Sequence, residues 1–370
     1  VMNGRRQIRR FLPGGATSFH EVLNLPGIVQ QNIVGIARDI QGGKAVSFPR
    51  RCWKPGSLCV AFCGDHVNDC GHGLLARGIE GLEGAKREVE AYGGKALMAP
   101  TDVSDPEQVE FAASRIEQEL GPIDIWVNNA MISIFGPFKE LDMKDFKRVT
   151  EVTYLGQVYG TQSALKRMLP RNKGSIILVG SALAYRGIPL QSAYCGAKHG
   201  IEGFFDSVRS ELFHDKSKVT ISMVQLPAMN TTQFSFVKSH LPNKPRPMGT
   251  IYQPEVAARA IVHVARHPQR EMYVGYPTVQ AILGNKLIPG LLDQYLGSIG
   301  YDGQQTDEPK EQDRPNNLYE PIPGDHGAHG SFDAQSWEFS PQTWAVTHKA
   351  ITWGALASLA LTIGLLVTRR

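Results

Sequence analysis

The chain has 370 residues, of which 42 % are hydrophobic and 20 % are charged. This length and composition suit one large α/β domain or two small ones and exclude a chain that is disordered throughout. Five cysteines are too few for a disulfide framework, and their odd number leaves at least one unpaired. Such cysteine usage is typical of a reducing compartment.

The net charge of +4 averages over four unlike segments. Residues 1–72 carry nine basic and four acidic side chains, residues 73–300 carry 25 and 22, residues 301–349 carry three and nine, and Arg369 and Arg370 end the chain. No segment combines a strong basic excess with interleaved aromatic residues, so a nucleic-acid partner is not expected.

Residues 1–72 form an atypical segment with RRQIRR at 5–10 and scattered Pro and Gly. Four of the five cysteines lie here, and a zinc site could be assembled from Cys52, Cys59, His66, Cys63, Cys70 and His72. Their spacing lacks the close cysteine pairs that are typical of zinc sites, so a metal-binding module is the weakest interpretation of this segment. No apolar stretch follows the arginines, which argues against a targeting peptide.

The pattern between residues 73 and 290 alternates between strands and helices in chain order. We expect helices at 81–92, 105–120, 142–169, 192–213 and 254–266, and strands at 95–103, 123–130, 175–180, 219–226 and 271–276. Apolar strands that alternate with helices predict a doubly wound, Rossmann-like parallel sheet that is covered on both faces. We therefore expect an α/β domain over residues 73–300.

The C-terminal part of the sequence divides in two. Residues 301–349 contain five prolines among many Asp, Gly and Gln residues, which predicts a polar, acidic and irregular linker. Residues 350–367 carry no charge and would form a helix about 27 Å long, close to the thickness of a bilayer. We expect a transmembrane helix here, with Trp344 and Trp353 at one interface, and the alternative is a helix buried against the domain.

Tyr194 and Lys198 stand one helical turn apart at the start of a predicted helix, so that they share one helical face. A phenol has a pKa near 10, and a neighbouring ammonium group stabilises its phenolate. Such a pair can move a proton to or from a carbonyl or alcohol oxygen. The alternative is an ordinary surface pair, so the neighbouring residues must decide.

Polar residues follow several of the predicted strands. Ser181 comes directly after the strand that precedes the Tyr194 helix, Asn128 and Asn129 end one strand, and Asp102 with Val103 ends another. Each polar residue alone could be a helix cap or a turn former. Their common place at the carboxyl ends of parallel strands, where such sheets bind ligands, favours a single site.

These residues resemble the motifs of the short-chain dehydrogenase/reductase family over residues 73–290. The resemblance rests on ARG at 76–78, DV at 102–103, NNA at 128–130, the serine at position 181 ahead of YCGAK at 194–198, and PAMNT at 227–231. It implies an oxidoreductase with a Rossmann-like fold that acts on a small carbonyl or alcohol substrate with a nicotinamide dinucleotide.

The resemblance also implies roles for individual residues. Tyr194 would be the general acid/base, Lys198 would lower its pKa and hold the nicotinamide ribose, and Ser181 would polarise the substrate carbonyl. The rest of the implied cofactor site comprises Asp102 and Val103 beside the adenine, Asn128 and Asn129 at the end of their strand, and Thr231, or Thr232 in a register one longer, at the carboxamide. Arg77 suits a 2′-phosphate, which favours NADP over NAD.

Two features depart from the family pattern. Thr153 stands where the family usually has an asparagine, although its hydroxyl can still hydrogen-bond a backbone group or water. The glycine-rich cofactor signature is missing before residue 77. The best candidate for a first strand is 58–63, and the stretch from Gly64 to Arg77 is too short for a helix and a second strand. The family pattern thus begins near Gly73, as if the upstream reading frame had been altered or misassigned.

The leading hypothesis is a membrane-tethered NADP(H)-dependent oxidoreductase whose catalytic domain lies in the cytoplasm and which could form a homo-oligomer. The rival is a non-catalytic, Rossmann-like interaction protein that lost phosphate binding together with its glycine loop. Residues 232–251 are the expected lid, and Phe234, Phe236, Leu241 and Met248 favour an apolar substrate, although a loop packed on the core would have the same composition.

Overall fold

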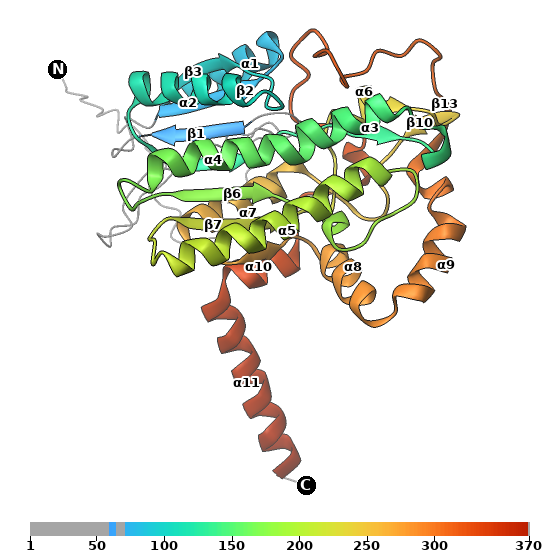
Figure 1. Cartoon of the computed structure of the whole chain (residues 1–370). Coiled ribbons are helices and arrows are strands. Elements are labelled where there is room, and N and C mark those ends of the chain that lie inside the picture. The colour runs from blue at the N-terminus through green and yellow to red at the C-terminus, as the bar shows by residue number, and fades with distance from the viewer. Residues whose placement is uncertain (1–58, 64–70, 369–370) are drawn as a thin grey trace, which may run out of the picture. The chain divides into compact units, whose positions relative to one another are not determined.

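The computed structural model describes residues 59–63 and 71–368, and its central element is a seven-stranded sheet (Figure 1). The strands run in the order β12-β7-β6-β4-β1-β2-β3. Their bounds are Cys59–Cys63 (β1), Gly71–Ala76 (β2), Lys95–Pro100 (β3), Ile123–Asn128 (β4), Ser175–Val179 (β6), Thr220–Gln225 (β7) and Glu271–Tyr273 (β12). The five strands predicted from residue 95 onward are all present in shorter form, and the Rossmann-like α/β arrangement is confirmed.

The prediction of an entirely parallel sheet is wrong for β1. This strand lies between β2 and β4 and pairs with both in antiparallel register, with Cys59 opposite Leu75 and Val60 opposite Val127. The other strands of the sheet pair in parallel wherever their neighbour is not β1. The candidate first strand is therefore present as Cys59–Cys63 and lies in the centre of the sheet, but it runs antiparallel to both of its neighbours.

Among the described residues, six helices cover the sheet. They are α1 (Ile79–Ala91), α2 (Pro106–Leu120), α3 (Met143–Thr150), α4 (Gly156–Met168), α5 (Ser192–His214) and α7 (Pro254–Arg266). The start of α2 shows why the chain turns helical here: Asp105 caps it by accepting hydrogen bonds from the backbone N–H groups of Glu107 and Gln108, and Pro106 fixes the first turn. The predicted long helix at 142–169 is continuous but includes a π-helical turn at Glu151–Leu155 between α3 and α4.

The two faces of the sheet carry separate hydrophobic clusters. On one face, Trp126, Ile176 and Leu178 pack against residues of α2, α4 and α5, such as Ile116 and Phe205. On the other face, β6 and β7 pack against α7, and α1 packs against β2 and β3 through a smaller cluster. The sheet is therefore covered on both faces, as its continuous apolar strands predict.

The described chain has further strands and α-helices outside the central sheet and the helices that cover it. They are β5 (Ile134–Phe135), β8 (Ala228–Met229), α6 (Gln233–Phe236), β9 (Lys238–Ser239), β10 (Asn243–Pro245), β11 (Ile251–Tyr252), α8 (Tyr276–Leu287), α9 (Pro289–Ile299), β13 (Gln305–Pro309), β14 (Ser336–Trp337), α10 (Pro341–Thr347) and α11 (Lys349–Thr368). Within the expected lid, Phe234 and Leu241 are buried in a cluster with Phe135 and Phe332. Their apolar character thus serves packing, the alternative that the composition left open.

Residues 301–349 are largely irregular but do not form a free tether. β13 pairs with β10, β14 pairs with β11, and Leu318, Ala328 and Phe332 are buried in the domain. The linker interpretation fails because a few apolar side chains and many main-chain hydrogen bonds dock an otherwise polar segment. The account of residues 1–72 as an altered reading frame lies mostly outside the described residues, as do Cys52, Cys70 and His66.

The predicted C-terminal helix is present as α11, which spans the predicted range. It contacts α10. The expected membrane span is not supported: within the described residues, no helix is both long and apolar enough to cross a bilayer.

Candidate active site

The polar residues predicted to form a site lie at the carboxyl edge of the sheet. Arg77 follows β2, Asp102 follows β3, Asn129 follows β4 and Ser181 follows β6. Because these strands are parallel to one another, their ends meet at the same edge, where doubly wound sheets bind ligands. β1 is the exception, since it begins at this edge with Cys59 instead of ending here.

Ser181, Tyr194 and Lys198 form a contiguous group. The Ser181 hydroxyl lies close enough to the Tyr194 phenol to lower its pKa, and the Lys198 Nζ lies 5.6 Å from the centre of the Tyr194 ring. Lys198 is buried, with 1 % of its surface exposed, and donates a hydrogen bond of 2.6 Å to the carbonyl of Val179 at the end of β6. The predicted shared face of α5 thus points at the strand end that carries Ser181.

Burial dominates the electrostatics of this group. It raises the pKa of Tyr194 above its ordinary value of 10, and the nearby Ser181 hydroxyl offsets only part of that rise. Burial also lowers the pKa of Lys198 from 10.5 to about 7. The spacing predicts a tyrosine whose pKa is lowered by the ammonium, whereas in the structure the net shift is upward because both groups are withdrawn from water.

Ser181 is held in place by residues that the sequence analysis did not identify. Its backbone N–H donates to the side-chain oxygen of Gln225 at 2.8 Å, and the amide group of Gln225 donates in turn to Glu202 and Glu271. The hydroxyl of Ser181 also caps a short turn by accepting from the N–H of Leu183 at 3.1 Å. A glutamine at the end of β7 has no sequence signature for such a role.

Thr153 lies in the π-helical turn and is fully buried. Its hydroxyl donates to the carbonyl of Ile132 at 2.8 Å and accepts from the N–H of the same residue at 3.1 Å. π-helical turns within regular helices are frequent at functional sites. The threonine therefore makes the backbone hydrogen bond that its hydroxyl allows, and it connects the helix to the loop after β4.

The two asparagines at the end of β4 differ. Asn128 ties β4 to α4, because its amide nitrogen donates to Thr161 at 3.0 Å and its oxygen accepts from the indole of Trp126 at 2.8 Å. Asn129 is also buried, but its Nδ2 has no hydrogen-bond partner among the described residues. Asn129 is therefore the one of the pair with a donor left for a ligand.

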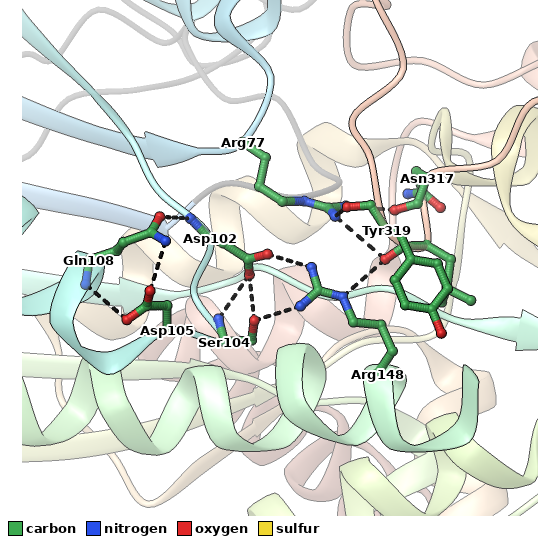
Figure 2. A network of polar contacts seen from close by, with 9 residues as sticks. Arg77, Asp102, Ser104, Asp105, Gln108, Arg148, Asn317 and Tyr319 are labelled. Atoms are coloured by element: carbon green, nitrogen blue, oxygen red, sulfur yellow. Dashed lines mark hydrogen bonds and ion pairs between the residues drawn. The ribbon is translucent and has the colours of Figure 1, made fainter. Parts of the chain in front are cut away.

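Asp102 and Arg77 meet a part of the chain that is distant in the sequence (Figure 2). Asp102 accepts hydrogen bonds from Ser104 and forms an ion pair with Arg148 of α3. Burial opposes ionisation of Asp102, but the hydrogen bonds from Arg148 and Ser104 outweigh it and lower its pKa. Arg77 donates to main-chain carbonyls of residues 317–319. Val103, next to Asp102, is buried in the main cluster.

Thr231 and Thr232 are buried, and Thr231 contacts a later part of the C-terminal segment. Thr231 pairs with His329 in an isolated bridge, and a Cβ at Gly330 would lie 2.5 Å from the Thr231 carbonyl. Asn230 donates to Asp333 at 2.7 Å, which fixes the same contact. Residues 317–333 therefore reach both ends of the candidate site.

A nicotinamide dinucleotide fits one end of this site better than the other. The Ser181–Tyr194–Lys198 group and the unpaired Nδ2 of Asn129 offer the donors that a ribose and a nicotinamide need. At the other end, the cavity beside Arg77, Asp102, Val103 and Ile132 has a volume of about 10 Å³, room for about one water molecule. The central strand β1 begins at this edge with Cys59, whereas a turn that holds the pyrophosphate follows the end of a strand.

Comparison with known proteins identifies the family. Residues 66–241 match the family described as short chain dehydrogenase. The chain is 32 % identical over 253 residues to the uncharacterized oxidoreductase YxnA of Bacillus subtilis (strain 168), and the match covers 68 % of this chain and 71 % of that protein. The chain therefore belongs to the short-chain dehydrogenase/reductase family of oxidoreductases.

Other relatives match over shorter stretches. Human dehydrogenase/reductase SDR family member 7 is 35 % identical over 143 residues, which cover 38 % of this chain and 42 % of that protein. The 3-dehydrosphinganine reductase of Danio rerio is 31 % identical over 202 residues, 51 % of this chain and 59 % of that protein. A metagenomic short-chain oxidoreductase solved in complex with NADP aligns with a TM-score of 0.44 and 22 % identity, over 54 % of this chain and 81 % of that one.

Proposed function

We propose that the protein is an NADP(H)-dependent oxidoreductase that interconverts a ketone or aldehyde with an alcohol. The observation that carries this proposal is the contact of Ser181 with Tyr194 beside the buried Lys198, at the carboxyl edge of a Rossmann-like sheet. The cofactor, when bound, supplies or accepts the hydride, and all proton handling falls to the protein.

In this mechanism Tyr194 gives its phenolic proton to the substrate oxygen during reduction and takes it back during oxidation. Ser181 donates a hydrogen bond to the same oxygen and holds the phenol in position. Lys198 stabilises the phenolate that reduction leaves behind, because an ammonium group is close to the ring. Its pKa of about 7 means that the charge on Lys198 depends on the bound ligands and on pH.

The same proposal assigns Asn129 and Lys198 to the nicotinamide ribose and Thr231 to the carboxamide. Arg77 would favour a 2′-phosphate and therefore NADP. Two relatives are named as reductases of 3-dehydrosphinganine or 3-ketodihydrosphingosine, which makes a long-chain ketone the first substrate to test. A cytoplasmic location and a homo-oligomeric state remain predictions, to be checked by fractionation and by light scattering of the full chain.

A non-catalytic, Rossmann-like interaction protein is the second candidate. Two observations favour it, namely the antiparallel β1 in the central position and the narrow cavity beside Arg77. Both observations argue against binding of the phosphates and the adenosine of a dinucleotide. The Ser181–Tyr194–Lys198 group, in contrast, would carry out the proton transfer and is unaffected by them.

Substitution of Tyr194 by phenylalanine separates the two candidates. We expect NADPH-dependent reduction of 3-dehydrosphinganine or of a ketone in a matched panel by the full-length protein, and a loss of at least about 100-fold in kcat for Tyr194→Phe. Ser175→Ala is the matched control, because this serine is buried on β6 away from Tyr194. Equal turnover of the protein and its Tyr194→Phe variant would refute the mechanism.

A further inference from the structure

The segment Asn317–Tyr319, here called the strap, lies across the end of the site that Arg77 marks (Figure 2). The guanidinium of Arg77 donates to the carbonyl of Asn317 at 2.6 Å and to that of Tyr319 at 2.5 Å, with a longer contact of 3.4 Å to Leu318. These main-chain oxygens accept hydrogen bonds from the guanidinium N–H groups of Arg77, which would otherwise donate to a phosphate.

A second guanidinium fixes the middle of the strap. Arg148 donates to the carbonyl of Leu318 at 3.2 Å and at the same time to Ser104 at 2.6 Å, and it forms the ion pair with Asp102. The residues after β2 and β3 are thereby connected to the strap through two arginines. The strap uses the polar groups that line the adenosine end of the proposed cofactor site.

The Leu318 side chain fills space as well. It is fully buried and belongs to the hydrophobic cluster that contains Val103, Ala130 and Ile132. The remaining cavity of about 10 Å³ cannot hold a purine. With the strap in place, neither the charged group nor the apolar surface at this end is accessible to an adenosine.

The strap is attached in a way that allows local release. Before Leu318, the chain is attached to main-chain carbonyls of α6. Arg314 donates to the carbonyls of Phe234 and Ser235, and the N–H of Asn317 donates to the carbonyl of Phe236. After Tyr319, residues 323–326 are exposed. Leu318 is thus the one apolar anchor of the strap, whose other described contacts are polar, and segments with few buried apolar contacts open at a lower free energy than the core.

We propose that the strap is an intramolecular occupant of the adenosine end of the site and that it must leave when a 2′-phosphorylated adenosine binds. The carbonyls of the strap replace the phosphate on Arg77, and the buried Leu318, whose carbonyl contacts Arg77 and Arg148, replaces the purine. The apparent affinity for the dinucleotide is then the intrinsic affinity multiplied by the fraction of molecules in which the strap is released. This inference rests on the proposed function, because it takes the site to be one for a dinucleotide.

The test uses 2′,5′-ADP, a probe without the nicotinamide, and isothermal titration of the full chain. Leu318→Ala removes the buried anchor of the strap and leaves Arg77 intact, so we expect binding to become about 10- to 100-fold tighter. Leu212→Ala is the control, because it truncates a leucine buried in the same cluster on α5 and should leave the affinity unchanged. Unchanged or weaker binding by Leu318→Ala, or no binding by any of the three proteins, would overturn the proposal.

Hydrogen exchange of the unmodified protein gives a second readout that does not depend on how the variant folds. We expect 2′,5′-ADP to increase amide exchange over residues 314–320, and increased protection there would mean that the strap closes over the ligand, which contradicts displacement. Neither experiment measures turnover. If the ligand displaces the strap but Tyr194→Phe retains activity, the proposed function is wrong and this inference stands. If turnover depends on Tyr194 but the strap stays docked, this inference is wrong and the proposed function stands.

Discussion

His329 should make the stability of the protein depend on pH between about 6.5 and 9. Its ring contacts Glu255 at 2.8 Å and Asp333 at 3.0 Å, which ties the C-terminal segment to α7. The hydrogen bond with Glu255 is the main cause that raises the pKa of His329 from 6.5 to about 9, with Asp333 adding to it against the effect of burial. Since the folded pKa is above the unfolded one, the stabilisation is complete below pH 6.5 and is lost as the pH rises through about 9.

The size of the effect follows from the pKa. A rise from 6.5 to about 9 corresponds to about 3 kcal/mol in the free energy of unfolding. Because 32 % of the side chain is exposed, solvent screening reduces this, and we expect about 1–2 kcal/mol.

The assay is urea unfolding of the full chain and of His329→Gln at pH 6 and at pH 9.5. Glutamine can still donate a hydrogen bond but carries no charge, and all other titrating groups are common to both proteins. The difference in unfolding free energy between the two proteins should be larger at pH 6, by about 1–2 kcal/mol. Parallel pH profiles, or a larger difference at pH 9.5, would refute the reasoning.

Two further predictions concern packing and cofactor choice. Gly160→Ala should lower the free energy of unfolding by about 1–3 kcal/mol, because the new Cβ would lie 2.1 Å from the Asn128 side-chain oxygen. Gly203→Ala is the control and should not destabilise the protein, because no atom lies within 4 Å of its new Cβ. Equal melting temperatures for the two variants would contradict this. Arg77→Ala should reduce the ratio of NADPH to NADH affinity by at least about 10-fold in fluorescence titrations, and an unchanged ratio would remove Arg77 from 2′-phosphate recognition.

Much of the fold follows from local sequence patterns. Asp105 and Pro106 mark the start of α2, and the apolar runs of β4 and β6 predict strands that are buried on both faces. The grouping of Ser181, Tyr194 and Lys198 also follows, since the helical spacing and the carboxyl ends of parallel strands both have a fixed geometry.

The remaining features depend on contacts that leave little trace in the sequence. The composition of 59–63 predicts a strand, but strand direction is set by pairing with β2 and β4. The strap escapes detection because Arg77 binds main-chain carbonyls, which every residue has, and a single Leu318 among polar neighbours supplies the buried anchor. The upward shift in the pKa of Tyr194 likewise follows from burial and not from its spacing to Lys198.

The most direct test of the central claim is to follow the hydride itself. The full-length protein is incubated with NADPH deuterated at C4 of the nicotinamide and with 3-dehydrosphinganine or the ketones of the panel, and the products are analysed by mass spectrometry. The account predicts an alcohol that carries one deuterium on the former carbonyl carbon. An alcohol without deuterium, or no alcohol from any of these ketones, would contradict it.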